Sequence, residues 1–315
     1  MSDPHSLTGL RGSMTALVSP FRDGRLDENA FVFLCERQID RGAAALVPCG
    51  TTGEASTLDR SEQMRLIQLA VEAARGRVPV IAGAGSNCTS TTIDLVHQAE
   101  QLGADAVLCV VPYYNRPTQE GLFRHFQAVQ AKTGLPVMLY DVPSRSGAGL
   151  AVETILRLAE LPRIVGLKDA SGDVPRTADL RRQLGSDFLL LSGNDGETAA
   201  ALALGSDGCI SVAANVAPAL CAALHRAWAD NDFGRFQYLR DLLDTLSAAM
   251  FVESNPIPVK WALARLGLME DELRLPLTPL SPCHEATVRH ALDSVLPHET
   301  EAAARGSVER RHAAE

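Results

Sequence analysis

The sequence is poor in the residue patterns that mark metal sites, disulfide frameworks and membrane spans. Its seven cysteines are scattered singly with no Cys-x-x-Cys pair, and its eight histidines show no metal-ligand spacing. Several cysteines lie inside apolar runs, which is typical of free thiols in a reducing compartment. No apolar run approaches the roughly 20 residues that a membrane helix requires, and the N-terminus has no apolar signal core. These absences predict a cytoplasmic protein without a bound metal or a membrane anchor.

Positive charge is also scarce. The formal net charge is −9, and no basic cluster interleaved with aromatic residues occurs, so a nucleic-acid partner is not expected. Apolar residues make up 46% of the chain and charged residues 21%, which are ordinary values for a globular protein. A chain of 315 residues can bury one large core and still carry a smaller appended unit.

Short apolar runs rich in Val, Leu and Ile recur through the first two thirds of the chain, as expected for strands that are covered on both faces. Segments with apolar positions at helical spacing separate them, for example at 59–75. Eight strands that alternate with helices predict a (β/α)₈ TIM barrel, with an open doubly wound sheet as the alternative. The predicted strands are 13–19, 44–48, 78–82, 106–112, 136–140, 164–168, 188–192 and 208–212.

From about Pro218 helix follows helix without an intervening strand, at 218–229, 233–250, 258–266 and 285–296. This change predicts a barrel over residues 1–230 and a small C-terminal helical domain over 231–297. The tail at 298–315 is charged and has no sustained apolar stripe, so we expect it to be disordered.

The most unusual strand end is at 164–173, which reads IVGLKDASGD. Lys168 interrupts an apolar run, although a lysine is almost never fully buried without a partner or a purpose. Asp169, Ser171 and Asp173 then supply turn and cap chemistry. Lys168 therefore lies at the carboxyl end of a strand, where barrel enzymes place their catalytic residues. A lysine that simply extends into solvent is the alternative.

Other strand ends carry polar groups of the same kind. The loop Gly50-Thr51-Thr52-Gly53-Glu54 offers hydroxyls and free amides to a carboxylate or phosphate, unless it is only a capped turn. Tyr113 and Tyr114 follow the fourth predicted strand, where their phenols could equally be packing groups. Tyr140 ends the fifth strand, and Arg145, five positions later, suits a planar carboxylate. The loop 83–87 begins like a dinucleotide fingerprint but lacks its third glycine.

A lysine, a phenol and hydroxyls on one barrel rim suggest an enzyme that forms a Schiff base. A lysine amine attacks a ketone only when it is neutral, and burial among apolar side chains disfavours the ammonium form. A nearby phenol can move the protons that carbinolamine dehydration and enamine formation require. The iminium is itself the electron sink, so this chemistry needs no external cofactor.

Six motifs carry a resemblance to a known family. They are GTTGE at 50–54, PYYNRPTQEG at 112–121, YDVPSR at 140–145, GLKDASGD at 166–173, LSGND at 191–195 and NPIPVKW at 255–261. With them the chain resembles the dihydrodipicolinate synthase (4-hydroxy-tetrahydrodipicolinate synthase) family of the N-acetylneuraminate lyase superfamily, over about residues 10–268. The arginine of YDVPSR and the PYYNRP segment favour the synthase over the sialic acid and keto-gluconate lyases.

The resemblance implies a lyase that condenses pyruvate with L-aspartate-4-semialdehyde to 4-hydroxy-tetrahydrodipicolinate, a step of lysine and diaminopimelate biosynthesis. It implies that Lys168 forms the covalent pyruvate imine. Tyr140 is then the proton relay, linked through Thr51 to Tyr114. In the family that last tyrosine comes from the neighbouring subunit, so a dimer is implied, and a homotetramer built from dimers is expected.

Four further positions match residues of the family that bind substrate. Thr52, together with Thr51, would hold the pyruvate carboxylate, and Arg145 would bind the carboxylate of aspartate-4-semialdehyde. Gly193 and Ile210 match positions that line the pocket, the latter through its carbonyl group.

The sequence departs from the family at Asp141, where an asparagine is often found. It also departs at the cleft where the family binds the inhibitor lysine, near positions that match Asn87 and Tyr113. Sensitive members have histidine and glutamate around that cleft, whereas this chain has Arg60, Gln63 and Thr91. An added cation and a missing carboxylate both disfavour a cationic ligand, so we expect weak or absent inhibition by lysine.

Two other functions compete with the synthase. One is another pyruvate-dependent Schiff-base aldolase of the same superfamily, acting on a sugar acid or another aldehyde. For that enzyme Arg145 would be idle, since no acidic second substrate would require it. The other is a catalytically silent oligomeric sensor or scaffold, which the presence of Lys168, Tyr140, Thr51 and Arg145 together disfavours.

Overall fold

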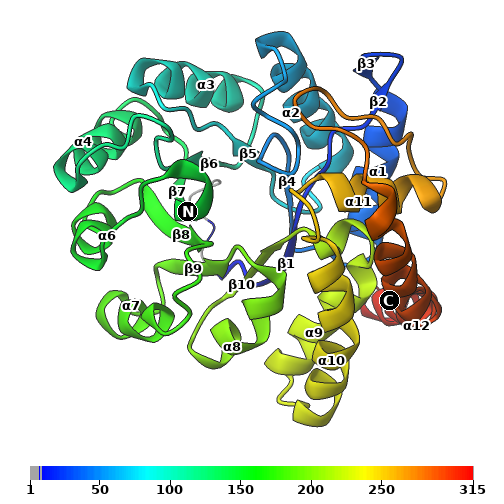
Figure 1. The fold of residues 1–315 in the computed structure, drawn as a ribbon. Coiled ribbons are helices and arrows are strands. Elements are labelled where there is room, and N and C mark those ends of the chain that lie inside the picture. The colour runs from blue at the N-terminus through cyan, green and yellow to red at the C-terminus, as the bar shows by residue number, and fades with distance from the viewer. Residues whose placement is uncertain (1–6, 8, 315) are drawn as a thin grey trace. The chain divides into compact units, whose positions relative to one another are not determined.

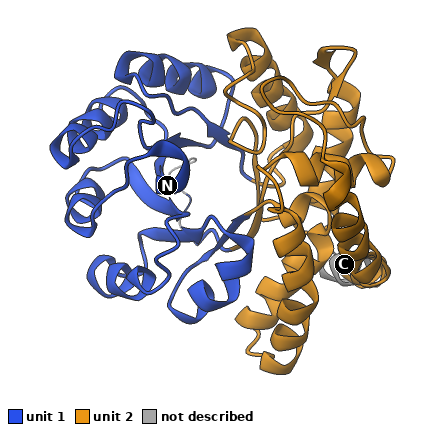
Figure 2. Ribbon diagram, viewed as in Figure 1, with its two compact units in different colours: residues 1–11, 79–210 blue, residues 12–78, 211–315 orange. Residues whose placement is uncertain are grey.

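The computed structural model describes residue 7 and residues 9–314, with side chains described as far as residue 306. Strands and helices alternate along the chain, and the eight predicted strands are all present (Figure 1). The fold is a (β/α)₈ TIM barrel with additional C-terminal helices, so the predicted fold class is confirmed. The chain forms two compact units, residues 1–11 with 79–210 and residues 12–78 with 211–315 (Figure 2).

Unit 1 contains six consecutive parallel strands, each of which pairs with the next along the chain. They are β5 (Ile81–Gly83), β6 (Ala106–Val110), β7 (Val137–Asp141), β8 (Ile164–Asp169), β9 (Leu189–Ser192) and β10 (Gly208–Ser211). Five helices connect them on the outer side of the strands (Figure 1): α3 (Thr89–Gln101), α4 (Gln119–Gln130), α6 (Val152–Ala159), α7 (Arg176–Leu184) and α8 (Thr198–Ala203). Because the strands run parallel, the loops that follow them lie at one end of the unit.

Unit 2 contains the parallel pair β1 (Gly12–Ala16) and β4 (Ala45–Val47). Its helices are α1 (Glu28–Asp40), α2 (Arg60–Ala74), α9 (Pro218–Ala229), α10 (Phe233–Ala249), α11 (Ile257–Arg265) and α12 (Pro282–Ala314). The sequence analysis missed its hairpin of two-residue strands, β2 (Phe21–Arg22) and β3 (Arg25–Leu26). The signal for it was present at Asp23 and Gly24, which both take positive φ angles in the turn.

Local chemistry explains why these segments adopt their structures. Strands β6 and β7 are apolar and almost wholly buried, as required of strands that are covered on both faces. Helix α2 begins with a capping box, in which the Asp59 carboxylate accepts a bond from the Glu62 amide and the Glu62 carboxylate accepts one from the Asp59 amide. Within the described residues, no helix is both long enough and apolar enough to cross a membrane.

The predicted disorder of the tail is wrong for residues 298–306, which continue helix α12. Glu299 is buried, and its carboxylate accepts hydrogen bonds from the amides of Ala219 (3.1 Å) and Leu220 (2.9 Å) in the first turn of α9. Those amides have no partner within their own helix, so a carboxylate from the tail satisfies them. This anchor is a single polar residue, and a search for an apolar stripe does not find it.

The side chains of residues 307–315, and all of Glu315, lie outside the described residues, as do residues 1–6 and 8. The predicted barrel and appendage, divided at residue 230, do not coincide with the two compact units. That boundary stays a prediction.

Candidate active site

Lys168 lies near the carboxyl end of β8, between two neighbouring strands of unit 1. It pairs in register with Tyr140 of β7 and with Leu191 of β9. The lysine is only 6% exposed, and its Nζ lies 4.2 Å from the centroid of the Tyr140 ring. Within the described residues, no carboxylate lies within ion-pair distance of this amine. The predicted lysine and phenol are therefore adjacent, and the alternative of a lysine that extends into solvent is wrong.

The carboxylates that follow Lys168 and Tyr140 directly in the chain are engaged with another cation. Arg176 of α7 donates to Asp169 (2.5 Å) and to Asp141 (2.7 Å), which end β8 and β7. Burial raises the pKa of Asp141, and the Arg176 guanidinium opposes that rise. The Asp141 carboxylate also accepts a hydrogen bond from the Leu150 amide at 3.3 Å. Asp141 therefore has a structural role, because it holds Arg176 and the Leu150 amide.

Gly193 follows β9 and lies directly against Lys168. A Cβ atom at Gly193 would lie 2.8 Å from the Ala170 Cβ and 3.1 Å from the Lys168 Cε, so only glycine fits without displacing its neighbours. The Gly193 amide also donates to the Asp169 carbonyl at 2.7 Å. Ile210 is fully buried in β10. Both predicted pocket residues therefore occur in unit 1 with Lys168.

Arg145 and the two tyrosines lie in exposed loops of the same unit. Arg145 is on the four-residue helix α5 (Pro143–Ser146), which the sequence analysis did not predict. Tyr114 is 89% exposed with a φ of +74°, and its amide donates to the Ser146 carbonyl at 3.2 Å. That bond links the loop after β6 to the loop that carries Arg145. Tyr113 is 38% exposed, so neither tyrosine is the packing group that the alternative required.

Some of the residues expected near an inhibitor cleft lie in two loops that are joined by a hydrogen bond. Asn115, which follows the two tyrosines, donates from its side chain to the Asn87 carbonyl at 2.9 Å. The loop with Asn87 and the loop with Tyr113 are therefore neighbours in unit 1. Thr91 lies exposed on α3.

Thr51 and Thr52 lie in unit 2, in the turn that follows β4. Thr51 is half-buried and Thr52 is buried. Amides of the turn donate back to the Gly50 and Thr51 carbonyls, and the Ser19 hydroxyl donates to the Gly53 carbonyl at 2.7 Å. The Asn255 amide group donates to the Thr52 Oγ1 at 2.9 Å. The loop is thus a fixed element, with one side chain from the C-terminal part of the chain directed at a predicted site residue.

A buried ion pair supports the same loop. Lys260 of α11 donates from Nζ to Glu54 (2.6 Å) and to the Ser19 carbonyl (2.9 Å), and both side chains are almost completely buried. Nζ also lies 4.3 Å from the centroid of the Phe21 ring. Burial lowers the pKa of Lys260, and Glu54 opposes that change. The sequence analysis quoted both motifs that supply this pair but assigned it no role.

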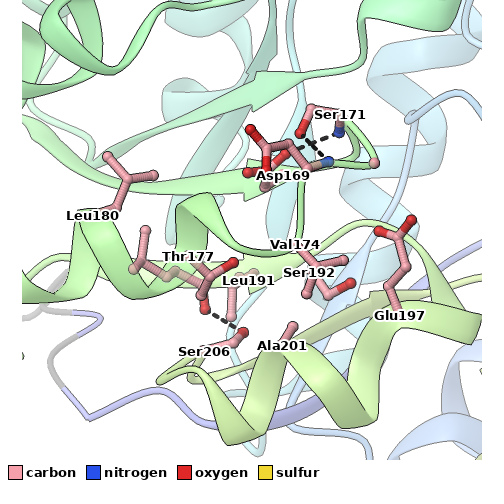
Figure 3. A pocket seen from close by; sticks show the side chains of 13 residues that line it. Asp169, Ser171, Val174, Thr177, Leu180, Leu191, Ser192, Glu197, Ala201 and Ser206 are labelled. Atoms are coloured by element: carbon pink, nitrogen blue, oxygen red, sulfur yellow. Dashed lines mark hydrogen bonds between the residues drawn. The ribbon is translucent and has the colours of Figure 1, made fainter.

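The pocket drawn in Figure 3 lies beside the carboxyl ends of β8 and β9. Apolar side chains such as Leu180, Leu191 and Ala201 form its walls, and polar groups such as Asp169 and Glu197 lie among them. Several of these polar groups already bond to neighbouring backbone. Asp169 accepts from the Ser171 amide, and the Ser206 hydroxyl donates to the Leu190 carbonyl. Hydrogen bonds of this kind between side chains and backbone are typical of turns and strand ends.

Within the described residues, the cysteines form no disulfide and the possible metal ligands form no metal site. All seven cysteines are free thiols, and five of them are buried. In the described part of the chain, no three His, Cys, Asp or Glu side chains are grouped so as to hold a metal ion.

Comparisons with known proteins identify the family to which the chain belongs. The model of the dihydrodipicolinate synthetase family matches residues 9–295. A 4-hydroxy-tetrahydrodipicolinate synthase of Hyphomonas neptunium is 52% identical over 283 residues, which are 89% of this chain and 97% of that protein. The synthase of Rhodospirillum centenum is 50% identical over 282 residues, covering 90% of this chain and 97% of that protein.

A solved structure gives the same result. The chloride-inhibited dihydrodipicolinate synthase of Acinetobacter baumannii, crystallised in complex with pyruvate, is 43% identical and superposes with a TM-score of 0.88. The match covers 90% of this chain and 98% of that one. The resemblance seen in the sequence motifs is thereby confirmed. The chain belongs to the dihydrodipicolinate synthetase family.

Proposed function

We propose that the chain condenses pyruvate with L-aspartate-4-semialdehyde to 4-hydroxy-tetrahydrodipicolinate through a Schiff base on Lys168. The observation that carries the proposal is the setting of that lysine. Lys168 is 6% exposed, and its amine lies 4.2 Å from the centroid of the Tyr140 ring with no carboxylate at ion-pair distance within the described residues. A buried lysine without a neutralising partner is costly to the fold, and catalysis is a reason to keep one.

The proposed chemistry begins when the neutral Lys168 amine adds to the carbonyl carbon of pyruvate. The resulting carbinolamine loses water to give the imine, and loss of a proton from the methyl carbon then gives an enamine. That carbon forms the new bond to the aldehyde carbon of the second substrate, and the aldehyde oxygen takes up a proton to become the hydroxyl. The amino group of that substrate then displaces the Lys168 amine from the imine, which closes the ring and frees the enzyme. Tyr140 is the group that moves protons in these steps, with Thr51 and Tyr114 as the other members of the relay. Since the iminium is the electron sink, the reaction draws on no external cofactor.

The remaining site residues have binding roles in this proposal. The hydroxyl of Thr52, together with Thr51, holds the carboxylate of pyruvate. Arg145 binds the carboxylate of aspartate-4-semialdehyde, a role that its exposed position supports. Gly193 leaves room beside the lysine, and the Ile210 carbonyl lines the pocket.

We also infer that the enzyme acts as a homo-oligomer in the cytoplasm, a tetramer built from dimers. Tyr114 supports this inference, because a proton relay requires a sheltered phenol and this phenol is 89% exposed in the single chain. A neighbouring subunit that received Tyr114 would bury it. The Acinetobacter baumannii relative, which was crystallised with pyruvate, supports pyruvate as the first substrate.

Steady-state assays with pyruvate and a panel of aldehydes test the second substrate. We expect turnover with aspartate-4-semialdehyde and little with aldehydes that lack a carboxylate. Arg145→Ala removes the planar cation, so kcat/KM for the semialdehyde should fall by about ten- to a hundredfold. Borohydride trapping of pyruvate should remain intact in that variant. Equal use of uncharged aldehydes by the wild-type enzyme would contradict the proposal.

A further inference from the structure

The hydrogen bond between Asn255 and Thr52 joins two side chains that lie 203 positions apart in the sequence. The donor is the Asn255 side-chain nitrogen, the acceptor is the Thr52 Oγ1, and the atoms are 2.9 Å apart. Thr52 is 2% exposed and Asn255 is 6% exposed. Because bulk water has almost no access to this pair, the bond restricts the direction of the hydroxyl proton.

The chemistry of the donor restricts what Thr52 can do. The nitrogen of a side-chain amide only donates, so it occupies a lone pair of the threonine oxygen. The single hydroxyl proton of Thr52 cannot point back toward that nitrogen. It must point elsewhere, which leaves Thr52 as a donor toward a third group.

Both partners are held so that this arrangement persists. Ser19 fixes the loop through the Gly53 carbonyl, and Glu54 is joined to Lys260 in the buried ion pair. Lys260 lies on α11, which begins two residues after Asn255. The segment 255–260 therefore fixes the loop through the ion pair between Lys260 and Glu54. It also orients the Thr52 hydroxyl through the Asn255 side-chain amide.

We propose that Asn255 is a positioning residue that keeps the Thr52 hydroxyl a hydrogen-bond donor to the carboxylate of the first substrate. This inference rests on the proposed function, in which Thr52 binds that carboxylate. A carboxylate only accepts hydrogen bonds, so a threonine that had given its proton to another acceptor would have none to offer. Asn255 prevents that loss without touching the substrate.

Two substitutions at Asn255 separate this role from a merely structural one. Asn255→Asp has nearly the same shape but presents acceptors, so it takes the Thr52 proton and adds negative charge. We expect it to raise the KM for pyruvate by about ten- to a hundredfold. Asn255→Ala leaves the hydroxyl free to rotate, so its KM for pyruvate should rise by only about two- to fivefold. In both variants kcat at saturating pyruvate should change less than KM.

A second series tests whether the effect passes through Thr52. Thr52→Val removes the hydroxyl, and adding Asn255→Asp to it should raise the pyruvate KM much less than the same change does in the wild type. Thr52→Ser should bind pyruvate nearly as the wild type does. Asn231→Asp, an exposed position in the same unit, adds the same charge as a control and should leave the KM unchanged.

The outcomes are distinct. If Asn255→Asp has the pyruvate KM of the wild type, or if the alanine and aspartate variants lose only thermal stability, the orienting role is overturned. Equal effects of Asn255→Asp with and without the Thr52 hydroxyl would overturn it as well. If the wild-type enzyme itself fails to trap pyruvate on Lys168, the proposed function fails first, so the two failures can be told apart.

Discussion

The two units each contain one buried lysine whose amine lies near an aromatic ring, but of these two lysines only Lys260 has a carboxylate partner within the described residues. Lys260 of unit 2 is fully buried and lies 2.6 Å from the Glu54 carboxylate, with a backbone carbonyl as a second acceptor. Lys168 of unit 1 is 6% exposed and its amine lies near the Tyr140 ring, with no carboxylate at ion-pair distance among the described residues. The chain has only one other lysine, Lys132, which is exposed.

This contrast distinguishes a lysine that stabilises the fold from a lysine that is suited to catalysis. A buried charge costs free energy unless a partner offsets it, and Lys260 has that partner. Near Lys168 the carboxylates of Asp141 and Asp169 are instead bound to Arg176. The carboxylates of that region are thus held away from the amine, which is what a nucleophile that must be neutral requires.

The largest expected effect concerns activity. Lys168→Met removes the nucleophile, so synthase activity should fall by more than about a thousandfold. Since methionine replaces a buried amine without a carboxylate partner, the melting temperature should stay the same or rise. Steady-state assays and thermal melting measure the two effects. A tenfold loss of activity corresponds to a change in activation free energy on the order of 1.4 kcal/mol. Residual activity within tenfold of the wild type would contradict the assignment of Lys168 as the nucleophile.

The next largest effect concerns stability. Lys260→Met leaves the buried Glu54 carboxylate without its cation and with the Arg274 amide as a remaining donor, so the free energy of unfolding should fall by about 3–5 kcal/mol. Adding Glu54→Gln should recover part of that loss, because the orphaned charge is then gone. Urea unfolding followed by circular dichroism measures both variants. Lys132→Met is the control and should change stability by less than about 0.5 kcal/mol; an equally mild Lys260→Met would refute the structural role.

Two histidines are also buried, one in each unit, and burial favours the neutral form of the imidazole ring. Burial lowers the pKa values of His125 in unit 1 and His225 in unit 2 from 6.5 to about 4. The unfolded chain therefore binds more protons below about pH 6.5, and stability is lost as the pH falls from there toward 4. Each histidine should contribute roughly 2–3 kcal/mol to that loss.

Urea unfolding at several pH values checks this expectation. The double variant His125→Gln with His225→Gln should show a weaker decline of stability between pH 6.5 and 4.5 than the wild type. The exposed His290→Gln should decline as the wild type does. An unchanged decline in the double variant would show that burial of these rings does not govern the acid sensitivity.

The smallest expected effect is the response to L-lysine. The family resemblance implies histidine and glutamate in lysine-sensitive members at the positions of Arg60, Gln63 and Thr91. We therefore expect micromolar L-lysine to leave the rate unchanged in a steady-state assay. The variant Arg60→His with Thr91→Glu, which removes a cation and adds a carboxylate, should gain sensitivity. Strong inhibition of the wild type would contradict the expectation.

The fold was predictable wherever a local pattern decides the structure. All eight barrel strands were predicted, because each is an apolar run between turn signals, as at 164–168. The short hairpin at Phe21–Leu26 and helix α5 were missed, since two to four residues carry too little pattern. The tail was misjudged because one buried carboxylate, Glu299, anchors it to α9.

Some features of the candidate site likewise follow from a local pattern in the sequence, and others do not. Lys168 and Tyr140 lie at strand ends and Arg145 follows β7 by four residues, so their placement in one unit follows from the strand pattern. Partners of buried groups do not follow from it. Glu54 and Lys260 are 206 positions apart, and Thr52 and Asn255 are 203 apart, so only the tertiary packing of the segment 255–260 against the loop brings each pair together.

Peptide mapping after treatment with pyruvate and borohydride tests the contrast between the two buried lysines most directly. Only three lysines can carry the reduced adduct, so mass spectrometry can assign it without ambiguity. The account predicts a pyruvyl adduct on Lys168, no adduct on Lys260 and none above background on Lys132. An unmodified Lys168, or equal labelling of Lys260, would contradict it.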